Sequence, residues 1–91
     1  MRYAYQPSFL DTTRHLSSAQ AAQLLKAVEQ CQHAMEHRHW PKGLGITHLR
    51  NDYFEFRVDR HLRVIDRRAG DLVQYVLYGH HDQVRRFLKA L

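Results

Sequence analysis

The chain has 91 residues, of which 44% are hydrophobic; this composition excludes an intrinsically disordered chain and fits one domain spanning residues 1–91. Fourteen Lys and Arg residues against nine Asp and Glu residues give a net charge of +5, and eleven of the fourteen are Arg. With Cys31 as the one cysteine and no run near the roughly 18 apolar residues of a membrane span, we expect a soluble, cytoplasmic protein without membrane contact. An arginine-rich basic domain favours nucleic acid or an acidic protein as its partner, and scattered solvated charges are the alternative.

The N-terminal part is expected to form a short strand and then a short helix. Tyr3–Tyr5 alternates weakly and indicates a strand that Pro7 ends. Ser8 can cap a helix that runs to about Leu16.

A second, longer helix is predicted next. Ser17 or Ser18 can cap it, and Ser17 with Gln20 has capping-box spacing. Apolar residues recur at helical spacing on one side: Ala21, Leu24, Leu25, Val28, Cys31 and Met35. The helix should end by Trp40-Pro41, because the residue before a proline disfavours the helical conformation.

After a loop at residues 42–45, the apolar period becomes two, which predicts antiparallel strands. Apolar and polar residues alternate over 53–59, and Leu62 and Val64 continue the apolar phase. A turn is expected at residues 67–71, followed by a strand at 72–77 that is covered on both faces. Asp82 can cap a final helix whose apolar side is Val84, Phe87, Leu88 and Leu91. The order β-α-α, then an antiparallel meander of three or four strands, then α, predicts an α+β fold.

The hairpin register follows from its core face. A two-residue turn would place Arg63 opposite Phe56, on the aromatic face. A three-residue turn instead places Val64 opposite Phe56, and we expect this register because one face must be apolar. Arg57 and Arg63 then lie side by side on the polar face.

Two neighbouring arginines repel each other unless a negative group lies between them. A phosphate is one such group, which makes Arg57 and Arg63 a candidate anion site. The alternative is that Glu55 and Asp59 neutralise the pair.

The segment Tyr78-Gly79-His80-His81-Asp82 leaves the last predicted strand and enters the last helix. A helix N-terminus is a ready anion site, and histidine transfers protons near neutral pH. Asp82 could orient one imidazole. The alternative is a capped helix start with two surface histidines.

These segments resemble the RelE/ParE superfamily, the toxins of type II toxin–antitoxin systems. The run YFEFRVDRHLRVI at 53–65 resembles the hairpin of these toxins, and GHHD at 79–82 is similar to the ending of one RelE-like branch. YQPSFL at 5–10 is similar to the opening of that branch, so the resemblance covers nearly the whole chain.

The resemblance implies a ribosome-dependent mRNA endonuclease that needs neither metal nor cofactor. In such enzymes the RNA 2′-hydroxyl attacks the adjacent phosphate with the help of a base. Arg57 and Arg63 match the arginines that stabilise the developing charge, and His80 or His81 matches the C-terminal acid or base.

The general base is left open by the resemblance, because Thr47 stands where the YoeB branch carries a glutamate. Glu55, His48 or one histidine of the pair can serve instead. Residues expected to contact RNA are His48, Arg50, Tyr78, Arg85 and Arg86.

The resemblance also implies partners, namely a cognate antitoxin and mRNA with ribosomal RNA on the ribosome. Two other functions stay open: a ParE-type gyrase inhibitor, and a non-catalytic binding module of the same fold.

Overall fold

The computed structural model describes residues 1–91 and contains one sheet flanked by helices. The elements in chain order are β1 Arg2–Tyr5, α1 Pro7–Thr12, α2 Ser18–His37, the 3-10 turn η1 Lys42–Leu44, β2 Thr47–Arg50, β3 Tyr53–Arg57, β4 Leu62–Ala69, β5 Leu72–His80 and α3 His81–Lys89. This order confirms the α+β fold.

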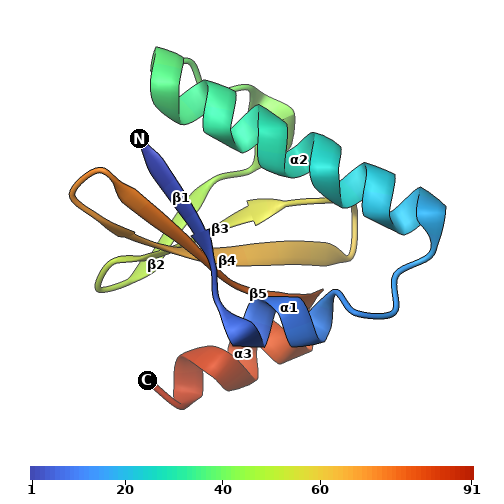
Figure 1. Cartoon of the computed structure of the whole chain (residues 1–91). Coiled ribbons are helices and arrows are strands. Elements are labelled where there is room, and N and C mark those ends of the chain that lie inside the picture. The colour runs from blue at the N-terminus through green and yellow to red at the C-terminus, as the bar shows by residue number, and fades with distance from the viewer.

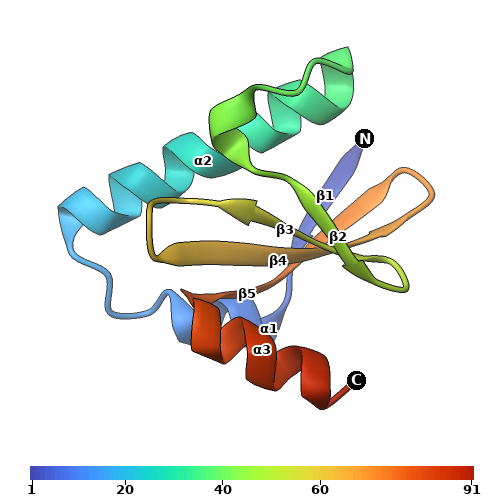
Figure 2. The ribbon, with the colours of Figure 1, turned by 180° about the vertical axis from the view of Figure 1, so that it is seen from behind.

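The five strands lie in the order β1-β5-β4-β3-β2. Strands β2 to β5 form an antiparallel meander of four strands, and β1 pairs in parallel with β5. The long helix α2 crosses one face of the sheet, and α3 lies on the other side (Figures 1 and 2). The last strand, β5, is therefore second from one edge of the sheet, and it passes directly into α3.

Helix α1 takes over from β1 along the edge of β5. After β1 ends, the Ser8 hydroxyl donates a hydrogen bond to the Val76 carbonyl. The Tyr78 N–H then donates to the Thr12 hydroxyl oxygen at 3.1 Å. These side chains satisfy backbone groups of β5 that would otherwise have no strand partner, because buried N–H and C=O groups must be paired. The C-terminal half of β5 is thus fixed by α1.

Most of the core lies between α2 and the sheet. Its buried residues include Leu24, Val28 and Cys31 from α2, with Phe56 and Tyr75 from the strands. A smaller cluster under α3 joins three residues, Ile65, Val76 and Val84. Strands β4 and β5 thus have buried side chains on both faces, and β5 continues directly into α3.

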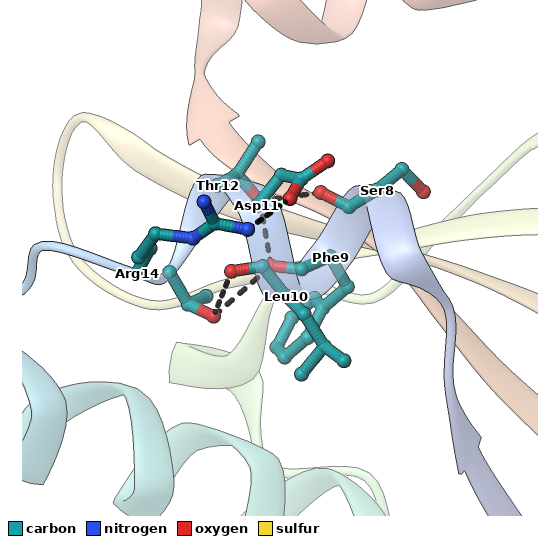
Figure 3. A network of polar contacts seen from close by, with 7 residues as sticks. Ser8, Phe9, Leu10, Asp11, Thr12 and Arg14 are labelled. Carbon is teal, nitrogen blue, oxygen red and sulfur yellow. Dashed lines mark hydrogen bonds and ion pairs between the residues drawn. The ribbon is translucent and has the colours of Figure 1, made fainter.

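The first helix begins and ends differently from the expectation. Gln6 takes the N-cap position and Pro7 the first helical position, so Ser8 is not the cap. The helix ends at Thr12 and not near Leu16. One reason is that the Thr12 hydroxyl donates back to the Phe9 carbonyl at 3.0 Å, which competes with continuation of the helix (Figure 3).

The second helix begins as expected. The Ser17 hydroxyl accepts from the Gln20 N–H at 3.1 Å, and Gln20 Oε1 accepts from the Ser17 N–H at 3.0 Å. This reciprocal pair is the capping box that the spacing predicted. The helix ends at His37, and Arg38 follows in the left-handed conformation with φ 53°.

The predicted turn at residues 67–71 is wrong, because β4 continues to Ala69 and Gly70-Asp71 alone turn the chain. Two contacts hold the Arg68 side chain against the sheet. Its Nε donates to the fully buried Asp66 carboxylate at 2.8 Å, and its guanidinium lies 4.0 Å from the centre of the Phe54 ring.

The start of the last helix also differs from the expectation. Strand β5 runs on to His80, which is the N-cap of α3, so Asp82 lies in the first turn and does not cap. The Gln83 Oε1 accepts from the His80 N–H at 2.8 Å. A Cβ at Gly79 would lie 2.5 Å from the same oxygen, so glycine leaves the room for this cap.

Candidate functional site

The hairpin of β3 and β4 has the register that its apolar face predicts. Phe56 pairs with Val64, and Arg57 pairs with Arg63. The Val58 N–H donates to the Leu62 carbonyl at 2.9 Å, which closes a three-residue turn. The two arginines are therefore neighbours on adjacent strands.

Neither arginine is neutralised by a carboxylate. Ion pairs are formed by other arginines, namely Arg2, Arg14, Arg67 and Arg68. The Asp59 carboxylate instead accepts from the N–H groups of His61 at 2.7 Å and Leu62 at 2.9 Å. These bonds hold the pKa of Asp59 below its usual range, because they favour the ionised form. Asp59 builds the turn and leaves the positive charge of the strands uncompensated.

Arg63 is held at the turn by backbone oxygens. Its Nη1 donates to the carbonyls of Asp59 at 3.0 Å and Leu62 at 3.2 Å. Carbonyl oxygens orient the guanidinium but carry no net charge, and its other N–H groups make no hydrogen bond within the chain. Arg63 is thus a fixed cation with free donors.

Arg63 lines an open hollow of about 520 Å³ between the hairpin turn and the start of α3. We call it the basic hollow. It has no hydrophobic lining residue and is formed by Arg60, His61, Arg63, His80, His81 and Asp82. Two arginines and three histidines face one carboxylate there, beside the N-terminus of α3, where backbone N–H groups favour an anion. The arrangement can bind a phosphate and transfer protons to and from it.

Sequence reasoning had named four of these six residues, Asp82 among them, and missed Arg60 and His61. Both lie in the tight turn that Asp59 caps, and Leu62, next to that turn, pairs with His80. The register of β4 against β5 could have revealed them, because it places the hairpin turn beside the end of β5.

Arg57 does not line the basic hollow, although it pairs with Arg63. Its side chain runs beside Gly45, where a Cβ would lie 3.6 Å from the Arg57 Cβ, Nε and Cζ atoms. Gly45 has φ 57°, a conformation that glycine adopts without strain. Only Arg63 of the pair therefore lines the basic hollow, and a phosphate held between the two guanidinium groups stays a prediction.

Glu55 lies two residues before Arg57 and pairs with Thr47 and Ile65. Its Oε2 is buried and has no hydrogen-bond partner. A buried carboxylate oxygen without a partner is costly, and it can accept a proton or a hydrogen bond. Glu55 is also outside the basic hollow.

The residues expected to contact RNA are dispersed. His48 Nε2 lies 2.6 Å from the Asn51 carbonyl oxygen, and its ring lies 4.7 Å from Phe54, away from the basic hollow. Arg50 Nη1 donates to the Leu88 carbonyl at 3.3 Å, near the C-terminal end of α3. Arg85 and Arg86 are exposed on α3.

Tyr78 is not available for stacking on a base. It is only 5% exposed, and its ring belongs to the core under α2. Burial raises the pKa of its hydroxyl, which therefore keeps its proton. Tyr78 was expected to contact RNA, but β5 directs its ring into the core, where the ring is closed to a base.

No helix of the chain has the length and apolar character needed to cross a membrane. His, Cys, Asp and Glu side chains nowhere gather in threes or more in a way that could hold a metal ion.

Solved structures decide the fold. RelE in a RelB–RelE antitoxin–toxin complex from Methanococcus jannaschii superposes with a TM-score of 0.70 at 15% identity, over 92% of this chain and 96% of that one. YafQ from E. coli gives 0.66 at 13% identity, over 92% and 98%. A YoeB/ParE toxin from Agrobacterium tumefaciens gives 0.65 at 13% identity, over 89% and 99%. The chain has the RelE/ParE toxin fold.

No protein-family model matches the sequence, and no curated protein matches it either. The RelE/ParE fold is therefore recognised from the structure and not from the sequence. Because the sequence identities are low, the chemistry of the site must be argued from the residues of this chain. In this example of the fold, the basic hollow lies where β5 passes into α3.

Proposed function

We propose that this protein is the toxin of a type II toxin–antitoxin pair and that it cleaves mRNA on the ribosome at the basic hollow. One observation carries the proposal. Arg63, His80 and His81, with Arg60 and His61, line one open hollow that contains a single carboxylate. Such a group of cations and proton-transfer groups suits a phosphodiester.

The proposed reaction needs only the residues of the chain. The RNA 2′-oxygen forms a bond to the adjacent phosphorus and gives its proton to a base. The bond from phosphorus to the 5′-oxygen breaks, and an acid returns a proton to that oxygen. Arg63 stabilises the charge that grows on the phosphate oxygens, and His80 and His81 supply the proton transfers. The products are a 2′,3′-cyclic phosphate and a 5′-hydroxyl.

Two further residues support this reaction from outside the basic hollow. Glu55 has a buried carboxylate oxygen without a partner and remains a candidate base. Arg57 has no carboxylate partner and lies one strand away from Arg63, where it can bind a neighbouring phosphate of the RNA. Arg85 and Arg86 are exposed on α3 and add positive charge there, to which RNA can also bind.

The proposed partners follow from the charge and from the similar structures. RelE and YafQ have been solved with the antitoxins RelB and DinJ. A net charge of +5 suits an acidic antitoxin here, and it also suits ribosomal RNA in the cytoplasm.

Cell-free translation with added protein, followed by primer extension on the message, tests the function. We expect cleavage of translated mRNA, and Arg63→Ala should lower its rate about 100-fold or more, as is usual for loss of a group that stabilises a transition-state oxyanion. His81→Ala should also lower the rate.

Arg2→Ala is the matched control, because Arg2 is an exposed arginine at the other end of the molecule, where it pairs with Asp71. Cleavage that persists in both site variants would contradict the proposal. Intact message together with inhibited DNA gyrase would point to ParE-type action, and no effect on either process would point to a binding module.

A further inference from the structure

A pocket of about 400 Å³ lies beside the segment that joins α2 to β2. It is formed by residues 40–42, 45 and 46 of that segment, together with Phe54 and Arg68 from the sheet. We call it the Trp40 pocket. In Figure 2 the segment from α2 to β2 runs on the α2 side of the sheet, and α3 lies on the other side. The Trp40 pocket shares no lining residue with the basic hollow, so it is a separate site.

The strands place the Trp40 pocket and the basic hollow on opposite faces of the sheet. Phe54 comes two residues before the buried Phe56, so both point to the face under α2. Arg63 precedes Val64, the partner of Phe56, and therefore points to the other face. A ligand in the Trp40 pocket would thus leave the basic hollow free.

The sheet side of the pocket is a flat group held in a fixed position. The Arg68 guanidinium lies 4.0 Å from the centre of the Phe54 ring, and its Nε donates to the fully buried Asp66 carboxylate at 2.8 Å. Trp40 also lines the pocket, and its indole is half exposed. Indole rings and guanidinium planes both stack on nucleobases, so these walls suit a flat ligand.

The backbone of the joining segment is anchored as well. Leu44 is buried in the main core. Its N–H donates to the Pro41 carbonyl at 3.2 Å, and the Gly45 N–H donates to the Lys42 carbonyl at 3.3 Å. Gly45 ends this turn with φ 57°, which glycine adopts without strain. The Trp40 pocket is therefore part of the built structure.

The charge that lines the Trp40 pocket is positive. Lys42 takes part in no ion pair of the chain, and Arg68 Nη1 makes no hydrogen bond within it. No Asp or Glu lines the pocket. Because Asp66 neutralises part of the charge of Arg68, Lys42 is the free cation. Flat walls beside a free cation suit a ligand that joins a flat ring to an anion.

We propose that the Trp40 pocket binds a nucleotide, with the base stacked on Trp40 and the phosphate at Lys42. A nucleotide joins a flat heterocycle to a phosphate, and the pocket has the volume of a small-ligand site. An acidic peptide would use the charge of Lys42 but leave the flat walls unused. The nucleotide can be free or one unit of an RNA strand, since both present the same groups. The inference does not depend on cleavage at the basic hollow.

An NMR titration of the full chain with adenosine 5′-monophosphate tests the proposal. Trp40 is the one tryptophan, so its indole N–H gives a single signal that reports on the pocket. We expect this signal to shift and saturate. Adenosine and inorganic phosphate should each bind about tenfold more weakly or less, because each keeps only part of the contacts. No saturable shift at millimolar nucleotide would overturn the inference, as would an equal affinity for phosphate or for a short acidic peptide.

Two variants test the stacking and the charge. Trp40→Leu keeps an apolar side chain but removes the flat surface, and it should weaken nucleotide binding about tenfold, followed by the Gly45 amide signal. Lys42→Gln should weaken the nucleotide by a similar factor and leave adenosine unchanged. Both side chains are exposed, so the variants should fold. Lys26→Gln, at an exposed lysine of α2 outside the pocket, is the matched control and should keep the affinity.

Arg63→Ala separates the Trp40 pocket from the basic hollow. We expect this variant to keep the nucleotide-dependent shift of the Trp40 indole. If Arg63→Ala removed that shift while Lys42→Gln kept it, the nucleotide would bind at the basic hollow and the inference would fail.

A short 2′-O-methyl oligoadenylate, which cannot be cleaved, distinguishes the two sources of the nucleotide. If it shifts the Trp40 indole at lower concentration than adenosine 5′-monophosphate, and Lys42→Gln weakens both ligands, the pocket takes one unit of an RNA strand. If only the free nucleotide shifts the signal, the pocket takes free nucleotides. If the protein leaves translated mRNA intact but still shows the shift, the nuclease proposal fails and the Trp40 pocket stands.

Discussion

At the scale of single residues, the site depends on groups that never touch a substrate. Asp59 lies in the hairpin turn, and its carboxylate fixes the N–H groups of His61 and Leu62. Arg63 in turn donates to the Asp59 carbonyl. The geometry of the hairpin turn, and with it the position of Arg63 in the basic hollow, therefore depends on Asp59.

Asp59→Ala should lower the free energy of unfolding by about 1–2 kcal/mol, the usual cost of a lost capping side chain. Asp59→Asn, which keeps an acceptor oxygen, should lower it less. The pKa of Asp59 is held low in the folded chain, so its stabilisation is present above the ordinary carboxyl range and is lost as the pH falls through the lowered value. Urea unfolding across this pH range checks both statements, and equal stability of Asp59→Ala and wild type at pH 7 would contradict them.

Cys31 gives a second prediction at this scale. It is fully buried, and burial raises the pKa of its thiol to about 12. The thiolate is the reactive form, so native protein at pH 8 should react with a thiol reagent only as fast as the core opens. Absorbance with an aromatic disulfide reagent, with and without denaturant, measures this, and rapid reaction of native protein would show that the core is less closed than described.

At the scale of elements, α1 substitutes for a strand along β5. Thr12→Val should leave the Tyr78 N–H without an acceptor and lower the free energy of unfolding by about 1–3 kcal/mol, the cost of an unpaired buried group. Thr12→Ser keeps the hydroxyl and should retain most of the stability. Hydrogen exchange of the Tyr78 amide reports on the bond directly, and an equally slow exchange in Thr12→Val would exclude this role for α1.

The elements that the sequence predicts well are those whose signals are local. Alternation over 53–59 predicts the hairpin register, and the Ser17 capping box predicts the start of α2. The strand β2 was not placed, because its four residues Thr47–Arg50 carry only one apolar side chain. The continuation of β4 through Arg67 and Arg68 was missed because it depends on a buried partner, Asp66, that no local pattern reveals.

Part of the candidate site could be predicted from local sequence signals, and part could not. His80 and His81 stand in a recognisable segment before a helix, and the register places Arg63 near them. Burial of Tyr78 and the divergence of Arg57 toward Gly45 depend on contacts between segments distant in the chain. The direction of a side chain at the end of a strand depends on contacts with other segments. The sequence therefore predicts which segments meet at the site, but not which of their side chains point into it.

At the scale of the whole molecule, the uncompensated positive charge predicts salt-dependent binding to RNA. The affinity should fall as salt rises, since each bound phosphate releases counterions. Arg63→Ala should make the logarithmic salt slope shallower by about one, the value expected for one lost phosphate contact, and Arg2→Ala should leave it unchanged. Titrations at several salt concentrations measure the slope, and an affinity independent of salt would exclude phosphate contacts as the main source of binding.

The pairing of β1 and α1 with β5 also has a consequence for the order of synthesis. Residues 2–12 leave the ribosome first, but the strand that they complete is made only from residue 72 onward. His80 and His81, on which the basic hollow depends, emerge after that. A partly made chain thus has neither a sealed core nor the proposed reactive end. Under the proposed function, the basic hollow can bind RNA only after the segment that carries His80 and His81 has been made and has folded against the hairpin turn.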